Sequence, residues 1–191
     1  MLMIVFSIKT QAIGLRYILP VYPLMFVLIF GLAERGWHRG RRGLLLGALL
    51  VWYVVSSVAI HPHYLAYFNE VAGGPSGGHR YLVDSNLDWG QDLKGLKRFM
   101  QEQDIEKIHL SYFGTDVPSR YSIAYEWLPI AVLDNPNPEQ QIPNRATGWI
   151  AISVTNLQGT YFANQNLFQY LRQYEPVARI GHSIHVCHLP P

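Results

Sequence analysis

Uncharged apolar residues dominate the first third of the chain, where they form two long runs. Residues 43–60, GLLLGALLVWYVVSSVAI, contain no charged side chain. A helix of this length rises about 27 Å, close to the roughly 30 Å hydrocarbon core of a bilayer. Residues 17–33 form the other run, with Pro20 and Pro23 near its start, where a helix tolerates proline best. We therefore expect two transmembrane helices.

Residues 1–8, MLMIVFSI, are also apolar, but they are too few to cross a bilayer. We interpret them as the tail of an earlier helix. A cleaved signal peptide is the alternative, although the stretch lacks a basic start and a small-residue cleavage site.

Arginines between the two apolar runs set the expected orientation. The loop 34–42, ERGWHRGRR, contains four arginines in nine residues. Short loops rich in Lys and Arg stay on the cytoplasmic side of a membrane. We therefore expect a multi-pass protein of the cell (inner) membrane, with residues 34–42 cytoplasmic and residues 63–191 extracytoplasmic.

From residue 63 onward the pattern changes to short strands and amphipathic helices. Asp88 and Gln91 have the spacing of a capping box, and Leu93 and Leu96 follow at helical spacing. This pattern predicts a helix over 89–103. The expected strands cover 81–83, 107–113, 149–154, 177–180 and 184–189, with the third one central and the last two forming a hairpin.

Two further stretches complete the expected architecture. Residues 167–174 are expected to be helical, and the Pro- and Asn-rich stretch 134–147 is expected to be a loop. The glycine-rich run 73–78 precedes a strand, whereas phosphate-binding loops follow one and open a helix. We therefore interpret that run as part of a flexible tether.

The predicted fold class is an α-helical membrane segment, with two transmembrane helices plus the tail of another, followed by a small α/β domain. The expected domains are residues 1–62 for the C-terminal transmembrane helices of a multi-span domain, 63–80 for the tether, and 81–191 for the extracytoplasmic α/β domain.

Charge differs sharply between these parts. Residues 1–62 contain six Lys or Arg and one acid, whereas residues 63–191 contain nine Lys or Arg and twelve acids. The net charge of +2 therefore arises in the membrane part, and nucleic-acid binding is not expected. Cys187 is the single cysteine, so no disulfide forms within the chain, and we interpret it as a small buried hydrophobe.

The stretch 84–92, DSNLDWGQD, concentrates polar side chains beside a tryptophan. It follows an expected strand, and ligands often bind where strands of open α/β sheets end. Hydrogen bonds and ring stacking at this edge are suited to a sugar. The alternative is purely structural: the acids cap the helix and shape the turn, and the tryptophan packs. The possible ligand-edge residues are Asp84, Asn86, Asp88, Trp89 and Asp92.

Metal and cofactor sites are not expected. The histidines include no His-x-x-x-His pair, and His182 and His185 would point to opposite faces of a strand. The 84–92 stretch lacks the spacing and closing Glu of an EF-hand loop.

Arg16 and Tyr17 lie at the expected outer end of the first apolar run. A charge near the membrane is costly and is often functional. A guanidinium group suits bidentate contact with a lipid phosphate. Snorkelling of the arginine to the interface is the alternative.

Five segments resemble the C-terminal part of bacterial glycosyltransferase family 39-like membrane proteins. That family is related to the dolichyl-phosphate-mannose protein mannosyltransferases and to lipid-carrier-dependent aminoarabinose transferases. The segments cover most of the chain, and the third is the most specific: IGLRYILPVYPLMF (13–26), HPHYLAYFNEVAGG (61–74), GHRYLVDSNLDWGQDL (78–93), ISVTNLQG (152–159) and YEPVARIGHSI (174–184).

The resemblance implies an enzyme that transfers a sugar from a polyprenyl-phosphate carrier to a glycan, protein or lipid acceptor outside the cytoplasm. The implied partners are membrane lipid, the carrier-linked donor and the acceptor. Arg16 would lie near the carrier phosphate. The family's catalytic carboxylate lies in a first outer loop that has no counterpart here. We therefore expect a C-terminal fragment of such a transferase, inactive alone.

Two other functions remain open. Residues 63–191 would serve as a non-catalytic, membrane-anchored domain that binds a glycan or a partner, for which the 84–92 stretch is the motivation. In the other alternative, the domain only braces the membrane helices.

Overall fold

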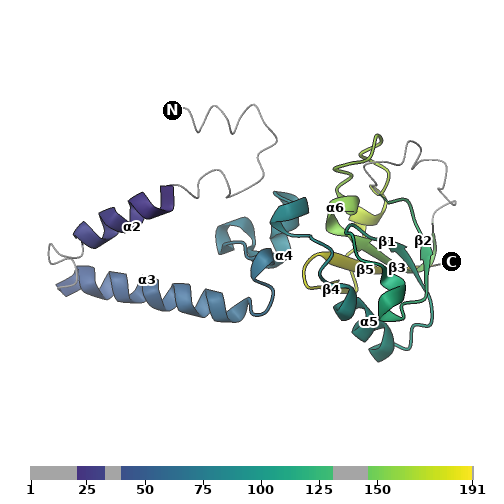
Figure 1. Ribbon diagram of the computed structural model, residues 1–191, viewed down its shortest axis with the longest axis horizontal. Helices are drawn as coiled ribbons and strands as arrows, with labels where there is room; N and C mark the ends of the chain where they lie inside the picture. Colours follow the sequence, from purple (N-terminus) through teal and green to yellow (C-terminus); the bar gives the residue numbers. More distant parts are fainter. Residues whose placement is uncertain (1–20, 33–39, 131–145, 191) are drawn as a thin grey trace. The chain divides into compact units, whose positions relative to one another are not determined.

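The computed structural model describes residues 21–32, 40–130 and 146–190. The chain divides into two compact units, 1–64 and 65–191, each of which has its own architecture. The described part of the first unit contains the helices α2 (Val21–Leu32) and α3 (Gly40–Ala59), which Figure 1 shows in purple and blue.

Helix α3 is the one helix in the described residues that is long and apolar enough to cross a membrane. Its 20 residues rise about 30 Å, and none of them is buried. Helix α2 is also apolar but has 12 residues, which rise about 18 Å and fall short of the hydrocarbon core.

The predicted fold class is therefore wrong as stated. It required two transmembrane helices plus the tail of another before a small α/β domain, whereas the described residues contain one helix of sufficient length. The expected multi-pass membrane location is not supported for the same reason. The tail expected at residues 1–8, the start of the first expected span and part of the 34–42 loop lie outside the described residues.

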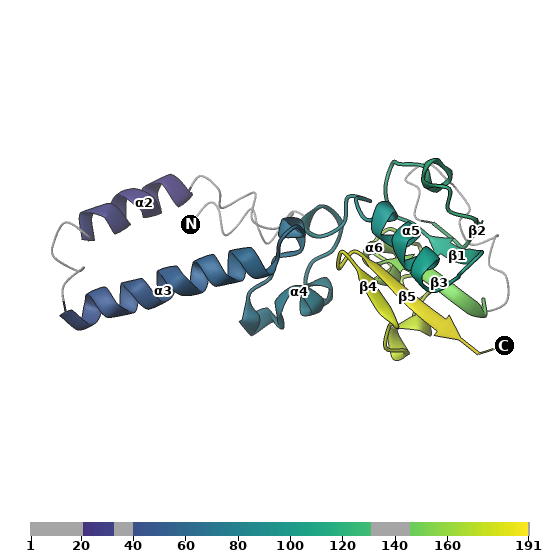
Figure 2. The same ribbon diagram turned by 90° about the horizontal axis from the view of Figure 1, so that it is seen from below.

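The second unit is built on a five-stranded mixed sheet in the order β2-β1-β3-β5-β4. Strand β1 pairs in parallel with β2 and β3, whereas β5 pairs antiparallel with β3 and β4. Figure 2 shows β3, β5 and β4 side by side. The strands are β1 (Ile108–Ser111), β2 (Tyr125–Trp127), β3 (Gly148–Ser153), β4 (Ala178–Ile180) and β5 (Ile184–Leu189).

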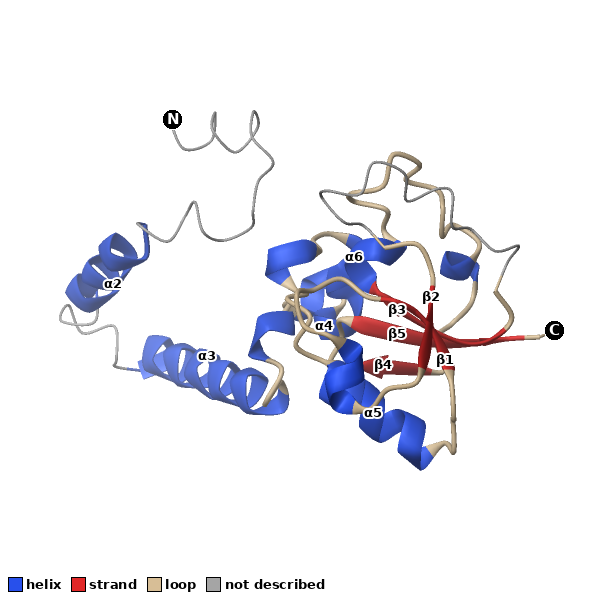
Figure 3. Ribbon diagram, turned by 45° about the vertical axis from the view of Figure 1, so that its right-hand side comes forward, coloured by secondary structure: helices blue, strands red, loops and turns tan. Residues whose placement is uncertain are grey.

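Both faces of the sheet are covered, because the central strand is apolar on both sides. Along β3, Ala151 belongs to one hydrophobic cluster, whereas Ile150 and Ile152 belong to the other. The first cluster includes the buried face of α5 (Leu93–Glu102), and the second includes Leu157 of α6 (Val154–Leu157). Figure 3 shows the two helices on different sides of the sheet. This two-sided burial explains the nearly continuous apolar run in the sequence of β3.

Several sequence-based elements are confirmed. The strands expected at 107–113 and 149–154 correspond to β1 and β3, and β3 is central in the sheet. The expected C-terminal hairpin is formed by β4 and β5, with residues 181–183 between them. These strands were predictable because their apolar residues recur at strand spacing or in short buried runs.

Other elements differ from the expectation. No strand forms at 81–83, where a turn leads into the 3₁₀ turn η6 (Asp84–Asn86). Helix α5 begins at Leu93 rather than at 89. Residues 167–174 form turns and the short 3₁₀ helix η9 (Leu171–Gln173) instead of an α-helix. Strand β2 was missed because its three residues lie at the sheet margin and have no readable period.

The expected tether folds into short helical turns, and most of the expected loop at 134–147 lies outside the described residues. The turns are η3 (Tyr64–Ala66), η4 (Glu70–Ala72), α4 (Gly74–Gly77) and η5 (Gly78–Arg80), and a further turn, η7 (Pro118–Tyr121), precedes β2.

Candidate functional site

The loop 84–92 lies at the carboxyl ends of the parallel strands β1 and β3. The Asp84 amide donates a 3.0 Å hydrogen bond to the Thr155 hydroxyl, two residues past the end of β3. The Tyr112 hydroxyl, just past β1, donates a 2.7 Å hydrogen bond to the Gly90 carbonyl. The loop therefore meets the sheet edge at which ligands often bind in α/β proteins, although the strand expected at 81–83 is absent.

Asp88 points into the domain and is 1% exposed. Its Oδ1 accepts a 3.1 Å bond from the Gly90 amide, and its Oδ2 accepts a 3.3 Å bond from the Thr155 hydroxyl. Burial raises the pKa of this carboxyl to about 7, and the nearby Asp92 adds to the rise. Asp88 is not the helix N-cap that the sequence predicted, because its side chain closes a turn onto Gly90 and α5 begins only at Leu93.

Asp92 connects the loop to the hairpin turn between β4 and β5. Its Oδ2 accepts hydrogen bonds from the Ser183 hydroxyl at 2.6 Å and from Gln91 Nε2 at 3.2 Å. A Cβ atom added at Gly181 would collide with this carboxylate. The side chain is thus packed between two segments, and it is 7% exposed.

The solvent-facing part of the loop includes Asp84, Asn86 and Trp89. The Trp89 side chain is 62% exposed, yet its indole N–H donates to the Ser85 carbonyl at 3.0 Å. Asp84 Oδ2 accepts a 2.7 Å bond from the Tyr161 hydroxyl. Of the five predicted ligand-edge residues, these three reach solvent, whereas Asp88 and Asp92 are buried.

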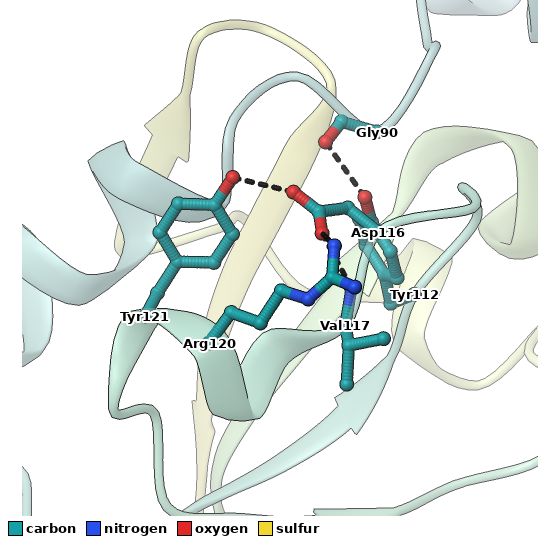
Figure 4. Close-up of polar contacts among 6 residues, drawn as sticks. All are labelled: Gly90, Tyr112, Asp116, Val117, Arg120 and Tyr121. Atoms are coloured by element: carbon teal, nitrogen blue, oxygen red, sulfur yellow. Dashed lines mark hydrogen bonds and ion pairs between the residues drawn. The ribbon is translucent and has the colours of Figure 1, made fainter.

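A second polar network lies in the segment that follows β1. Asp116 accepts hydrogen bonds from the Tyr121 hydroxyl, the Val117 amide and Arg120 (Figure 4). The Tyr121 hydrogen bond, more than any other contact, holds the pKa of the Asp116 carboxyl below its usual value. The Asp116 carboxylate therefore accepts its hydrogen bonds from residues 117–121 of the same turn.

A cavity of about 470 Å³ lies elsewhere in the second unit, beside the segment 164–173. Four amide side chains and two aromatic residues line it, together with small apolar groups, and its described lining contains no Asp, Glu, Lys, Arg or His. We call it the amide-lined cavity; its residues are Leu128, Pro129, Ala146, Asn164, Asn166, Leu167, Phe168, Gln169, Tyr170 and Gln173.

Local contacts hold the turns that form this cavity. The Asn166 amide donates a 3.0 Å bond to Asn164 Oδ1, and the Gln169 amide donates a 2.9 Å bond to the Asn166 carbonyl. Phe168 is buried and packs edge-on against Phe162, with ring centroids 5.6 Å apart. The amides are thus presented by a folded segment with a buried aromatic anchor.

Neutral amides both donate and accept hydrogen bonds, and aromatic rings offer apolar faces. The cavity is therefore suited to a neutral ligand that carries several hydroxyl groups. The sequence reasoning missed it, although the density of Asn and Gln between 156 and 173 was a visible signal.

Two predicted residues cannot be placed, because Arg16 and Tyr17 lie outside the described residues. Their proposed contact with a lipid phosphate stays a prediction. Within the described residues, no group of three or more His, Cys, Asp or Glu side chains is arranged to hold a metal ion.

Comparison with known proteins gave no relatives: no protein-family model, no curated protein and no solved structure matches the chain.

Proposed function

We propose that this chain acts in membrane glycosyl transfer from a polyprenyl-phosphate carrier, and that residues 65–191 contribute the domain that binds the sugar. The amide-lined cavity is the observation that carries the proposal. Its volume of about 470 Å³ falls within the range of small-molecule sites, and its lining matches a neutral polyol.

Helix α3 supports a membrane location for the chain. It is 20 residues long, is rich in apolar residues and has no buried residue. Arg41 and Arg42 lie in its first turn, and Arg35 and Arg39 precede it in the sequence. By the positive-inside rule, this end of α3 is cytoplasmic and the domain after it is extracytoplasmic, on the side where the resemblance implies transfer.

The domain's own part in the reaction is binding rather than proton transfer. The described lining of the cavity contains no carboxylate that would act as general base on an acceptor hydroxyl. Transfer itself rests on the resemblance of the five sequence segments. The alternative is a non-catalytic, membrane-anchored glycan-binding domain, and the same cavity favours it equally.

Sugar binding is tested by removing one amide from the cavity. Gln169→Ala in the full chain, solubilised in detergent micelles, is expected to weaken binding at least tenfold, because a lost hydrogen bond leaves buried sugar hydroxyls without a partner. Calorimetric titration with a panel of free hexoses and pentoses measures the affinity.

Gln165→Ala is the matched control, since Gln165 belongs to the same segment and its side chain is outside the cavity lining. Equal affinities for the two variants, or no binding of any sugar by the unmodified chain, would contradict the proposed site.

Transfer is tested in cells whose own copy of the chain is replaced by each variant. The measured quantity is the movement of labelled sugar from polyprenyl phosphate to an acceptor outside the cytoplasm. A slower rate for Gln169→Ala alone supports a role in transfer. Weakened sugar binding with an unchanged transfer rate favours the glycan-binding alternative.

A further inference from the structure

A second pocket, of about 190 Å³, also borders η9 but is lined by different residues from those of the amide-lined cavity, and it is strongly basic. Three arginines line it, Arg80 from η5, Arg172 from η9 and Arg179 from β4, together with two histidines. One carboxylate, that of Glu175, belongs to the lining. We call this site the arginine pocket.

The single carboxylate leaves an excess of positive charge. Glu175 Oε2 lies 3.1 Å from a terminal nitrogen of Arg179, so these two charges compensate each other. Arg80 makes no ion pair with any residue that the structure describes. An arginine that lines a pocket and lacks an internal acidic partner is available to an anion from outside.

Arg172 is held in place by backbone carbonyls. Its Nε donates a 2.8 Å hydrogen bond to the Leu157 carbonyl, and its Nη2 donates a 2.9 Å bond to the Gln165 carbonyl. These bonds orient the guanidinium group but do not neutralise it, because both acceptors are uncharged. The pocket therefore contains a pre-positioned cation, which lowers the entropic cost of binding an anion.

The pKa values of the two histidines in the pocket are lowered by burial and by the nearby arginines. His79 and His185 pack edge-on with ring centroids 4.8 Å apart. Burial lowers the pKa of His79, and Arg80 and Arg179 lower it further, against the weaker opposing effects of a hydrogen bond to the Ser76 backbone and of Glu175. The pKa of His185 falls to about 3 through burial, His79, Arg179 and His182. Both rings are therefore neutral at pH 7, and they neither add to nor offset the charge of the arginines.

We propose that the arginine pocket binds a phosphate group, with Arg80 and Arg172 as its charged contacts and the neutral His79 ring beside them. Planar guanidinium groups form paired hydrogen bonds to phosphate oxygens, and excess positive charge in a partly enclosed pocket strengthens them. The site is distinct from the amide-lined cavity and from the lipid-phosphate contact predicted for Arg16. It does not depend on the proposed sugar binding.

The first test titrates the full chain in detergent micelles with inorganic phosphate and with glycerol phosphate at fixed ionic strength. Arg80→Gln is expected to weaken binding at least tenfold. Arg98→Gln is the matched control, because it removes the same charge from the exposed face of α5 and leaves the pocket intact. Arg80 is exposed and forms no ion pair with the described residues, so its variant is expected to fold.

A spectroscopic readout separates phosphate in this pocket from phosphate elsewhere. The pKa of His79, followed by NMR of its ring protons, is expected to rise when phosphate binds, because the anion offsets the effect of Arg80 and Arg179. The same measurement in nanodiscs of phosphatidylcholine, with and without phosphatidic acid, identifies the source. A rise with phosphatidic acid alone assigns the site to a lipid headgroup, and a rise with dissolved phosphate assigns it to a soluble ligand.

Either rise, if abolished by Arg80→Gln and retained in Arg98→Gln, supports the site. No rise with any of these probes, or equal weakening of phosphate binding by the two substitutions, would overturn it.

Discussion

Asp88 and His185 are buried side chains whose pKa values shift in opposite directions from their usual ranges. The pKa of Asp88 rises from 3.8 to about 7, so the folded state retains a proton that the unfolded state releases. Stability from this residue is complete below pH 3.8 and is lost as the pH rises toward 7. The pKa of His185 falls from 6.5 to about 3, so its effect on stability has the opposite sign. Between pH 3.8 and 6.5 the two slopes, each ~1.4 kcal/mol per pH unit, offset each other.

When either group is removed, the free energy of unfolding is expected to vary with pH as the other group dictates. In Asp88→Asn, the free energy of unfolding is expected to rise with pH across the range 3.8 to 6.5, because His185 then dominates. In His185→Gln it is expected to fall across the same range. Urea unfolding of the full chain in micelles at a series of pH values measures both slopes.

The slope is the readout here, because either substitution also changes hydrogen bonds and therefore the absolute stability. Parallel pH profiles for the two variants would show that Asp88 and His185 do not carry the pH dependence.

At the scale of elements, the loop 84–92 makes a very close contact with Tyr112, the residue that follows β1. A Cβ atom at Gly90 would collide with the Tyr112 hydroxyl oxygen, and the Gly90 φ of 74° is left-handed. No other residue type fits this position without movement of the loop. The close approach allows the Tyr112 hydroxyl to bond the Gly90 carbonyl, which attaches the loop to the end of the strand.

Gly90→Ala is expected to destabilise the domain by about 2–4 kcal/mol, since it adds both a clash and a strained φ. Gly74→Ala is the control for strain alone, because Gly74 also has a positive φ of 65° but no atom within 4 Å of the added Cβ. Adding Tyr112→Phe to Gly90→Ala removes the colliding hydroxyl.

The double variant is therefore expected to be less destabilised than the sum of the two single variants. Chemical denaturation of the unmodified chain, the two single variants and the double variant measures the four free energies of unfolding. Additive effects would indicate that the Tyr112 hydroxyl does not limit position 90.

The elements also show where sequence patterns succeed and where they fail. Strands β1, β3 and β5 followed from local apolar spacing, because their burial is repeated along each strand. The start of α5 was misplaced because Asp88 has the spacing of a cap, whereas its side chain bonds Thr155, which is distant in the sequence. The turns at 167–174 depend on hydrogen bonds from Arg172 to two carbonyls, which periodicity does not contain.

For the molecule as a whole, local sequence identified one part of the candidate site and missed the rest. The 84–92 loop is continuous, so its polar residues were visible as a group. The amide-lined cavity combines Leu128, Ala146 and the segment 164–173, which meet only when the sheet forms. Of the two expected membrane spans, α3 has the length to cross a bilayer, whereas α2, within the described residues, does not.

The orientation proposed for the chain gives a further prediction. Alkaline phosphatase and green fluorescent protein are each fused after Pro191. Because this end of the chain is expected to lie outside the cytoplasm, the phosphatase fusion is expected to be active and the fluorescent-protein fusion dark. Replacing Arg41 and Arg42 by Asn is expected to reduce this asymmetry, because those charges favour the cytoplasmic side. Bright fluorescence with an inactive phosphatase in the unmodified chain would place the domain inside the cell.

The two outer strands of the sheet affect how neighbouring copies of the chain interact. Both outer strands, β2 and β4, have three residues, and each exposes a charged side chain at its centre, Glu126 in one and Arg179 in the other. If the chain is anchored in a membrane, as proposed above, its copies meet repeatedly at high local concentration, where long strand edges without a partner would join into continuous sheets. Short outer strands with a charged side chain provide few backbone groups for a strand of another copy to pair with. Neighbouring copies are therefore expected to collide and separate rather than polymerise.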